Sequence, residues 1–388
     1  MLNNQPAAIP AILFLLLFLP PQKGWTQQEQ LQEFSIYYPD NQTPKEHFQG
    51  FITGTDTIKH GHYQYYLPNG SLRQQGRFEN NQPEGMWEIL YSHGIAEQII
   101  HFRKGIRHGS YRSFFDHGKL RQEGTYQNGL LHGWFTEYFD SGIKESETFF
   151  VNGVVNGTRT IYYPDGAPWQ VAEFYNGIEH GTWKQYHPNG QLNYKGCKEM
   201  GLNADTLLTF YDTGQLQRIS LFKNGMLHGP YKAYHPNGGI MIRGTYNNGE
   251  LQGRYQEYYT NGSKMMEGHF VSGNREGKWH SFYPSGMVYT SGEYHNNMFN
   301  GMWRVFHPDG TLKQRGEYSN HQAAGLWEFF NENGFLSSRG WFIQDKKQGA
   351  WRYWQDQYPF APLQDILYIN NGRSGLIRKY PITNESIE

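Results

Sequence analysis

Short runs in which apolar and polar residues alternate fill most of this chain, and turn residues separate the runs at even intervals. The stretch 124–142 reads GTYQNGLLHGWFTEYFDSG, with aromatic and aliphatic residues set among polar neighbours and with Asn-Gly and Ser-Gly pairs at the breaks. Alternation with a period of two predicts half-buried β-strands, and Asn-Gly tolerates the positive φ angles of a tight hairpin. The pattern therefore predicts short antiparallel strands joined by hairpin turns.

The runs recur with a period of 24 residues that no insertion or deletion interrupts. Starting at Gly61, twelve of the thirteen positions reached in steps of 24 residues are glycine, and the exception is Asp205. A second glycine stands nine residues after each of the first twelve positions, as Gly70 does after Gly61. Self-similarity at a fixed spacing identifies a repeat protein in which each unit is one supersecondary element.

Aromatic residues follow the same period at three positions of the unit. They stand two, five and seventeen residues after the first glycine, as Tyr255, Tyr258 and Phe270 do after Gly253. We call these positions the +2, +5 and +17 columns. Rings at such regular positions of a hairpin repeat are expected to pack against equivalent rings of neighbouring units.

Rings are also predicted to lie across the strands from glycines. If each turn has two residues, counting back from one turn places Tyr231 opposite Gly244 and Gly229 opposite Tyr246. A ring that covers a strand glycine compensates for the missing side chain. The joint excess of glycine and aromatic residues therefore indicates packing and gives no sign of catalysis.

Together these features predict an all-β protein, an elongated single-layer antiparallel meander of stacked β-hairpins. Residues 61–354 would form the array, with about two dozen strands extending on the order of 110 Å at about 4.8 Å per strand. Each unit would touch only its neighbours, so the stability would be nearly one-dimensional. Residues 27–60 are expected to be an N-terminal cap with an imperfect repeat, and residues 355–388 a C-terminal cap.

The composition supports this interpretation and narrows the chemistry. Among 388 residues the chain has 29 Tyr, 25 Phe, 11 Trp and 46 Gly, so it buries rings more than aliphatic side chains. The formal net charge of −1 gives no general attraction to nucleic acid or to an anionic membrane. One cysteine, Cys197, excludes an internal disulfide and a multi-cysteine metal site, and we interpret it as a packing residue.

The apolar run at residues 7–21 predicts a targeting segment. Its length of about 15 residues is short for a membrane span and typical of a signal peptide, and cleavage after Thr26 fits the small residues there. We therefore expect residues 1–26 to be a signal peptide and the protein to be exported. An uncleaved anchor is the alternative, because Lys23 follows the run and no basic residue precedes it.

The residue before the first glycine is often histidine, which raises the question of a metal site. Equivalent positions in adjacent hairpins lie two strands apart, roughly 9.5 Å, whereas Zn–N distances are about 2.0–2.1 Å, so neighbours cannot readily share an ion. The same column also holds Glu, Asn and Gln, which favours a polar residue leading into the glycine. The histidines are His60, His108, His132, His180 and His228.

The chain has no recognisable reaction centre. We find no nucleophile elbow, no Cys/His pairing, no phosphate-binding loop and no dinucleotide fingerprint, so we expect no enzyme, no cofactor and no catalytic or metal-binding residue. A one-layer sheet has two faces, and exposed aromatic rows bind sugars, peptides or other apolar surfaces. The candidate binding residues, taken as surface aromatics, are Trp183, Tyr186, Trp279, Trp303, Trp327 and Trp351.

One unit departs from the pattern. In 196–210, Lys198 replaces an aromatic residue, Asp205 replaces the glycine and Leu207 replaces the tryptophan, yet the period continues. Sequence drift in a tolerant array explains this unit, and the alternative is a local bend or a contact with a partner.

The repeat resembles the MORN-repeat superfamily, and its bacterial variant found in YwqK-type antitoxins most of all. The resemblance rests on the spacing of Gly, Asn-Gly, Trp and Tyr in 124–142 and 292–310, and it extends over residues 61–354. It implies an elongated hairpin array that serves as an interaction scaffold and, from the antitoxin name, neutralises a toxin by binding it.

The expected function is therefore that of an exported, non-enzymatic scaffold that binds a protein and not nucleic acid, with an antitoxin or immunity role as a special form. The alternative is binding of a cell-surface glycan, of peptidoglycan or of lipid through the aromatic columns. Gene neighbours that include a toxin would favour the first interpretation.

Overall fold

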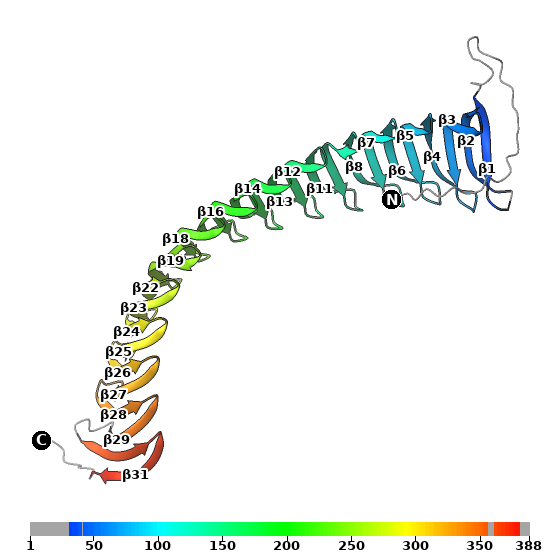
Figure 1. Ribbon diagram of the computed structural model, residues 1–388. Helices are drawn as coiled ribbons and strands as arrows, with labels where there is room; N and C mark the ends of the chain where they lie inside the picture. Colours follow the sequence, from blue (N-terminus) through cyan, green and yellow to red (C-terminus); the bar gives the residue numbers. More distant parts are fainter. Residues whose placement is uncertain (1–30, 41, 356–360, 381–388) are drawn as a thin grey trace. The chain divides into compact units, whose positions relative to one another are not determined.

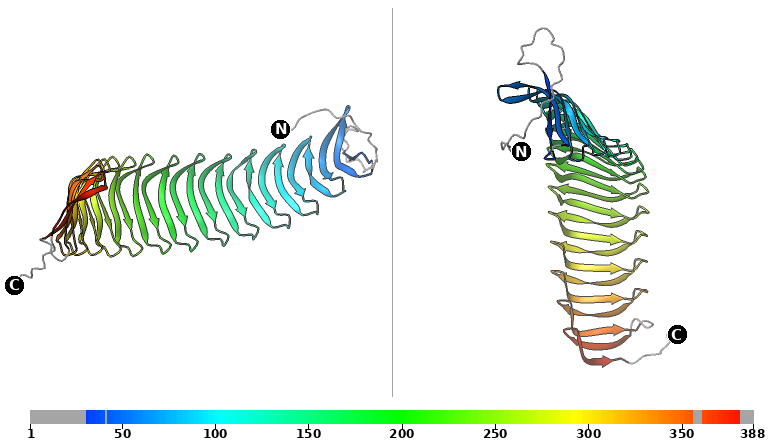
Figure 2. Two further views of the ribbon diagram at one scale, coloured as in Figure 1. Left: turned by 90° about the horizontal axis from the view of Figure 1, so that it is seen from below. Right: turned by 90° about the vertical axis from the view of Figure 1, so that its right-hand side faces the viewer.

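The computed structural model describes residues 31–40, 42–355 and 361–380, and over these residues the protein is all-β (Figure 1). The expected signal peptide, residues 1–26, lies outside the described residues. The chain divides into two units, Met1–Gly190 and Gln191–Glu388. Within each unit the strands form an open, one-layer antiparallel meander of hairpins, as the sequence predicted (Figures 1 and 2). In the described part of the chain, no helix is long and apolar enough to cross a membrane.

The first unit contains strands β1 to β14, and each pairs with the strand that follows it in the chain. Strands β9 and β10 are two parts of one strand, since both pair with β8. The strands are β1 (Gln32–Tyr37), β2 (Pro44–Thr53), β3 (Asp56–Tyr66), β4 (Leu72–Glu79), β5 (Gln82–Leu90), β6 (Ala96–Arg103), β7 (Ile106–Phe114), β8 (Leu120–Gln127), β9 (Leu130–Leu131), β10 (Gly133–Tyr138), β11 (Lys144–Val151), β12 (Val154–Tyr162), β13 (Pro168–Tyr175) and β14 (Ile178–Tyr186).

The second unit contains β15 to β31 in the same arrangement, with β20 and β21 both paired to β19. The strands are β15 (Leu192–Glu199), β16 (Leu202–Phe210), β17 (Leu216–Lys223), β18 (Met226–Tyr234), β19 (Ile240–Asn247), β20 (Glu250–Leu251), β21 (Gly253–Tyr258), β22 (Lys264–Val271), β23 (Asn274–Phe282), β24 (Val288–His295), β25 (Met298–Phe306), β26 (Leu312–Ser319), β27 (Gln322–Phe330), β28 (Leu336–Ile343), β29 (Lys346–Trp354), β30 (Pro362–Ile369) and β31 (Gly372–Lys379).

One end of each hairpin is a two-residue turn, and from the turn between β4 and β5 onward both of its residues have positive φ. Asn128 and Gly129 have φ values of 51° and 84°, and the flanking Gln127 and Leu130 are paired. Both φ values are those of a type I′ turn, whose twist matches that of the strands it joins. At this end of the hairpins the Asn-Gly pairs therefore form the tight turns that the sequence predicted.

The other end of each hairpin is longer than the sequence led us to expect. The backbone N–H of Leu67 donates to the carbonyl of Ser71, and that of Gly70 donates to the carbonyl of Leu67. Three residues thus form the loop, with Gly70 at φ 81°. A bulge before Tyr66 absorbs the extra residue. The assumption of a two-residue turn at this end was wrong.

The predicted strand register is nevertheless correct because the bulge lies next to the turn. Tyr231 pairs with Gly244, and Gly229 pairs with Tyr246. Every member of the first glycine column also has positive φ, and so does its one exception, Asp205, at 53°. This backbone conformation is costly for residues with a Cβ, so it explains the glycine column.

The aromatic face, on which the +2 and +17 columns lie, forms the core. Trp327 lies flat on Gly316 of the preceding strand, where an added Cβ would overlap the indole. Its Nε1–H donates to the carbonyl oxygen of Glu317 at 3.2 Å. Gly316 is paired in register with Trp303, as counting predicted, but Trp327 of the next repeat is the ring that covers it. The same arrangement recurs for Trp87, Trp279, Trp303 and Trp351 over Gly76, Gly268, Gly292 and Gly340.

The two aromatic columns interlock along this face. Tyr318 contacts Trp327 edge to face, with ring centroids 5.1 Å apart, and Phe342 contacts Trp351 in the same way at 5.1 Å. Edge-to-face rings at such distances contribute about 0.5–1.5 kcal/mol beyond the area they bury. Each ring contacts its own repeat and the next one, so neighbouring repeats stabilise each other.

The sheet continues beyond the array at both ends. At the N-terminal side, Phe34 of β1 and Phe48 of β2 are buried and stack at 5.3 Å. At the C-terminal side, β30 pairs with β29 and places buried Ile366 opposite Trp351. In the 24-residue repeat that departs from the pattern, Leu207 lies over Gly196 in the position that tryptophan takes in other repeats.

Candidate binding face

The opposite face of each sheet, which we call the polar face, carries a straight row of side chains that are directly paired from strand to strand. In the first unit this central row runs from β2 to β14 and is of mixed charge. Its members are His47, Gln64, Gln75, Glu88, Ile99, Arg112, Glu123, Thr136, Glu147, Thr160, Val171 and Lys184.

In the second unit the central row runs from β15 to β31, and most of its charged members are cations. Its members are Lys195, Leu208, Ile219, Lys232, Arg243, Gln256, Glu267, His280, Ser291, Arg304, Arg315, Glu328, Arg339, Arg352, Asp365 and Arg378.

The +5 column lies on the polar face, although the +2 and +17 columns lie on the other. Tyr138 donates a hydrogen bond to Glu123 of the central row at 2.7 Å, and Tyr162 donates to Glu147 at 2.6 Å. Burial, together with the adjacent carboxylate, raises the pKa of each of these two phenols to about 12. The phenols of Tyr138 and Tyr162 therefore stay protonated donors at neutral pH.

In the second unit, cations of the central row pack on rings of the +5 column. The guanidinium of Arg315 lies 5.9 Å from the ring centre of Phe330, and that of Arg339 lies 5.6 Å from Trp354. The +5 rings are half-buried. Cation–π contacts of this kind contribute about 0.5–1 kcal/mol at exposed sites and hold the cations upright on the face.

The structure corrects the exposure expected of the candidate tryptophans. Trp279, Trp303, Trp327 and Trp351 are buried in the aromatic face, because each lies on a glycine and between neighbouring rings. The prediction that these four tryptophans are exposed at the surface was wrong.

The two remaining candidates, Trp183 and Tyr186, are half-buried and lie on opposite faces. Trp183 is on the aromatic face, paired with Ala172 where most other repeats have glycine. Tyr186 belongs to the +5 column of the polar face, and its carbonyl oxygen accepts a hydrogen bond from Tyr163 at 2.8 Å. A role in binding stays a prediction for both residues.

The polar column before the first glycine has a structural task that the sequence did not reveal. In five repeats its side chain accepts a hydrogen bond from the backbone N–H of the first residue in a neighbouring two-residue turn. His, Glu and Gln all provide such an acceptor, which explains why the column tolerates them. The pairs are Glu84 with Lys104, His108 with Asn128, Gln252 with Ser272, Glu276 with Asn296 and Gln348 with Asn370.

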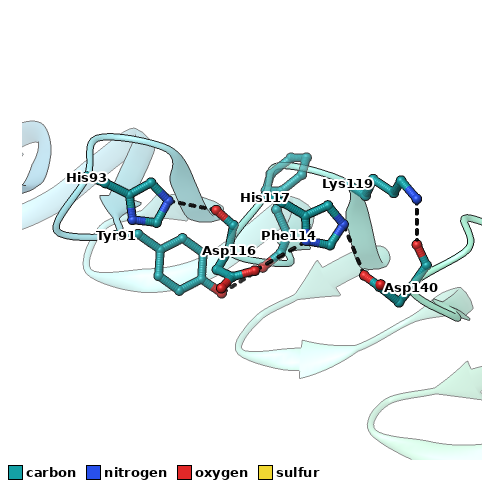
Figure 3. A network of polar contacts seen from close by, with 7 residues as sticks. All are labelled: Tyr91, His93, Phe114, Asp116, His117, Lys119 and Asp140. Atoms are coloured by element: carbon teal, nitrogen blue, oxygen red, sulfur yellow. Dashed lines mark hydrogen bonds and ion pairs between the residues drawn. The ribbon is translucent and has the colours of Figure 1, made fainter.

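A second set of hydrogen bonds links the three-residue loops along the other edge (Figure 3). The phenol of Tyr91 donates to the carbonyl of Phe114 at 2.9 Å, and Tyr259 and Tyr283 make the same bond to residues 23 positions later. In Figure 3, His117 lies between the carboxylates of Asp116 and Asp140, at 3.2 and 3.0 Å. This network joins successive loops.

The structure also contains an open hollow of about 460 Å³ on the polar face of the first unit. It lies across β1 to β5 and is lined mainly by polar side chains, among them Glu33, His47, His62, Gln75 and Arg77. Among the described residues, no group of three or more His, Cys, Asp or Glu is arranged to hold a metal ion.

Sequence reasoning missed a row of exposed apolar side chains on the polar face of the second unit. Each of these side chains is two positions in sequence from a member of the central row and so lies on the same face. They are Met302, Leu326, Trp341 and Leu367, which are 37%, 41%, 57% and 36% exposed. Leu326 and Trp341 are directly paired. The signal was present in the sequence, since Trp341 falls outside every aromatic column and follows a strand glycine, which places it on the other face.

The fold and its faces define an all-β hairpin-repeat protein. The family model "MORN repeat variant" matches residues 59–80, 107–128, 179–197, 206–224, 227–248, 251–272 and 299–320. The chain therefore carries MORN-variant repeats at these seven positions.

Other comparisons add little to the family match. No curated protein is significantly similar to the chain. Among solved structures, the Photorhabdus luminescens Tc holotoxin pore with a TccC3-D651A mutation is 10% identical, covers 87% of this chain and has a TM-score of 0.15. The TcdB2-TccC3 structure is 11% identical, covers 88% and has a TM-score of 0.13. The chain spans about a quarter of the length of these proteins, and scores this low carry no argument.

Proposed function

We propose that this protein is a non-enzymatic repeat scaffold that binds another protein through the polar faces of its sheets. MORN-variant repeats support a binding role. The choice of face depends on one observation, the burial of the +2 column. Most of its tryptophans pack between repeats, whereas most side chains of the central rows are half-buried or exposed and stand in register.

Such a face suits a protein partner because its side chains repeat at a fixed spacing on a stiff backbone. Adjacent members of a central row belong to paired strands about 4.8 Å apart. Many are fixed by neighbours, as Arg315 is by Glu328 at 2.6 Å, so little conformational entropy is lost on binding. Extended partners would gain affinity from several weak contacts at once.

The proposed use of the polar face can be tested by site-specific photo-crosslinking in the native cells. A photoreactive residue replaces Glu123 or Arg304, both in central rows, and matched controls replace the exposed loop residues Ser141 and Asn333. We expect one defined protein partner to crosslink from the row positions and not from the loops. Crosslinks from the loops alone, or none to protein under several growth conditions, would rule the proposal out.

The glycan, peptidoglycan and lipid alternative is an outcome of a parallel assay. It relied on exposed aromatic columns, and the buried +2 tryptophans no longer support it. Purified sacculi, glycans and vesicles are incubated with the protein, and retention on one of them without any protein crosslink would favour that alternative.

We further propose that the protein is exported and that residues 1–26 are its signal peptide, on the basis of the apolar run at 7–21. Amino-terminal sequencing of the mature protein tests this proposal, with a new terminus near residue 27 expected.

An antitoxin role is a special form of protein binding. Co-expression with a toxin encoded by a neighbouring gene should then restore growth.

A further inference from the structure

We propose that the polar face of the second unit, across strands β25 to β30, is a docking site for an acidic polypeptide segment that also carries an apolar residue. This inference rests on the proposed function and names the chemistry of the partner. Two adjoining rows of the face define the site. One contains Arg304, Arg315, Glu328, Arg339 and Arg352, and the other contains Met302, Leu326, Trp341 and Leu367.

The first observation is that like charges are placed directly opposite each other. Arg304 is paired with Arg315, and Arg339 is paired with Arg352. Like charges at directly paired positions destabilise a sheet, whereas an acidic residue at either position would stabilise it. A sequence that keeps a locally unfavourable arrangement on an exposed face is most readily explained by a function outside the fold.

The second observation is that the carboxylates of the face do not neutralise these cations. Glu317, paired with Met302 in the adjoining row, is exposed and forms no ion pair within the described residues. Glu328 is bound to Arg315, and Asp365 is bound to Arg352 by two hydrogen bonds at 2.9 and 3.0 Å. Arg304 and Arg339 are exposed and make no ion pair within the described residues. Two guanidinium groups, each able to hold a carboxylate through paired N–H donors, are thus available to a partner.

The third observation is the apolar row beside these cations. Trp341 is 57% exposed, whereas the tryptophans of the +2 column in the same unit are buried. Trp341 is directly paired with Leu326 and follows Arg339 by two positions on the same strand face. A partner could therefore contact an apolar side chain and a cation side by side. Exposed Trp and Arg are the side chains that most often dominate protein interfaces.

The interspersed carboxylates favour a polypeptide over a continuous polyanion. A nucleic acid strand or an anionic membrane laid along the row would meet Glu328 and Asp365 as well as the arginines. A polypeptide segment presents separate carboxylates and can place them at Arg304 and Arg339 alone. An apolar side chain between them would reach Leu326 and Trp341.

The test is a peptide-display selection on the full chain, followed by affinity measurement. The random library makes no assumption about the partner. The site variant is R304Q/R339Q, which removes charges that the sheet does not need, and W341S is measured separately. The charge-matched control is K346Q/R373Q, which neutralises two exposed cations beside the two-residue turns. Circular dichroism and thermal unfolding confirm that each variant is folded.

We expect the selected peptides to contain at least two acidic residues and one apolar residue. Binding should weaken about tenfold in R304Q/R339Q and in W341S, and less than about threefold in the control. Selected peptides without acidic enrichment, no selected peptide at all, or equal affinity for R304Q/R339Q and the wild type would overturn the inference. So would tight binding of single-stranded DNA or phosphatidylserine vesicles at these arginines in preference to the peptides. None of these results would contradict a crosslink from the central rows to a protein partner. The proposed function and the docking site for an acidic segment can therefore fail separately.

Discussion

The indole nitrogen of Trp351 donates a hydrogen bond to the carbonyl oxygen of Trp341 at 3.2 Å, yet the two rings lie on opposite faces of the sheet. Trp351 is fully buried, and Trp341 is 57% exposed. The difference follows from position alone. Trp351 belongs to the +2 column and covers Gly340, whereas Trp341 follows that glycine and points the other way.

The contact between ring and glycine predicts a large effect of one methyl group. In G316A the new Cβ would overlap the indole of Trp327, so the ring must move or the strands must separate. We expect the free energy of unfolding to fall by about 1–3 kcal/mol or more. Urea denaturation of the full chain measures this change. The control is G375A, since a Cβ there meets no atom within 4 Å, and a similar loss in both variants would show that the ring contact is not the cause.

The 24-residue repeat that departs from the pattern offers positions at which the chain can be stabilised. Asp205 has φ 53°, a conformation that costs a residue with a Cβ roughly 1 kcal/mol more than glycine. D205G should therefore raise the melting temperature, and adding L207W, over Gly196, should raise it further. T206G is the control, because glycine in an ordinary strand position should lower the melting temperature. If D205G lowered it as well, strain at this position would be refuted.

The ion pair between Arg352 and Asp365 predicts loss of stability in acid. Hydrogen bonds from Arg352 hold the pKa of the Asp365 carboxyl below its ordinary value of 3.8. Because the folded-state pKa is the lower one, the unfolded chain binds more protons, so stability is present above about pH 4 and is lost as pH falls through the folded-state pKa.

We expect D365N to be less stable than the wild type at pH 7 and to lose less stability between pH 5 and pH 2. Denaturation midpoints at a series of pH values give both curves, with D56N as a control because Asp56 is exposed and makes no ion pair within the described residues. Parallel pH curves for D365N and the wild type would exclude this carboxyl as the cause.

The hydrogen bonds between loops predict a local effect. Y259F removes the phenol that donates to the carbonyl of Phe282 at 2.9 Å, so we expect a loss of about 1 kcal/mol. Hydrogen exchange should rise mainly in the two repeats that the bond joins, because each repeat contacts only its neighbours. Y289F is the matched control, since Tyr289 is exposed and makes no hydrogen bond within the described chain. Exchange that rises uniformly along the unit would argue against this local coupling.

Much of the fold could be predicted from the sequence because its determinants are local. The Asn-Gly turns need positive φ, and the strand register follows from counting between them, as Tyr231 opposite Gly244 shows. The ring that covers each glycine could not be obtained by counting. It comes from the next repeat and depends on a second bulge at the first glycine, as at Gly325, where the register shifts between Arg315 and Glu317.

The candidate site was less predictable for the same physical reason. Trp327 and Trp351 have the composition of a binding surface, and only the three-dimensional contact with glycine shows that they are buried. Arg339 and Arg352 lie on consecutive strands and become directly paired only through the register shift between Arg339 and Trp341, which counting from the turn does not give. Periodicity alone does not show which polar positions face each other.

The loop-to-loop hydrogen bonds all point the same way along the chain. The donor phenol of Tyr91, Tyr163 or Tyr283 always reaches the carbonyl 23 residues later, and never the carbonyl 23 residues earlier. Each repeat that takes part in this series therefore has inequivalent sides, one giving the donor phenol and the other the acceptor carbonyl. Removing a hairpin from one end is not the mirror image of removing one from the other, and a further repeat could be appended in only one orientation.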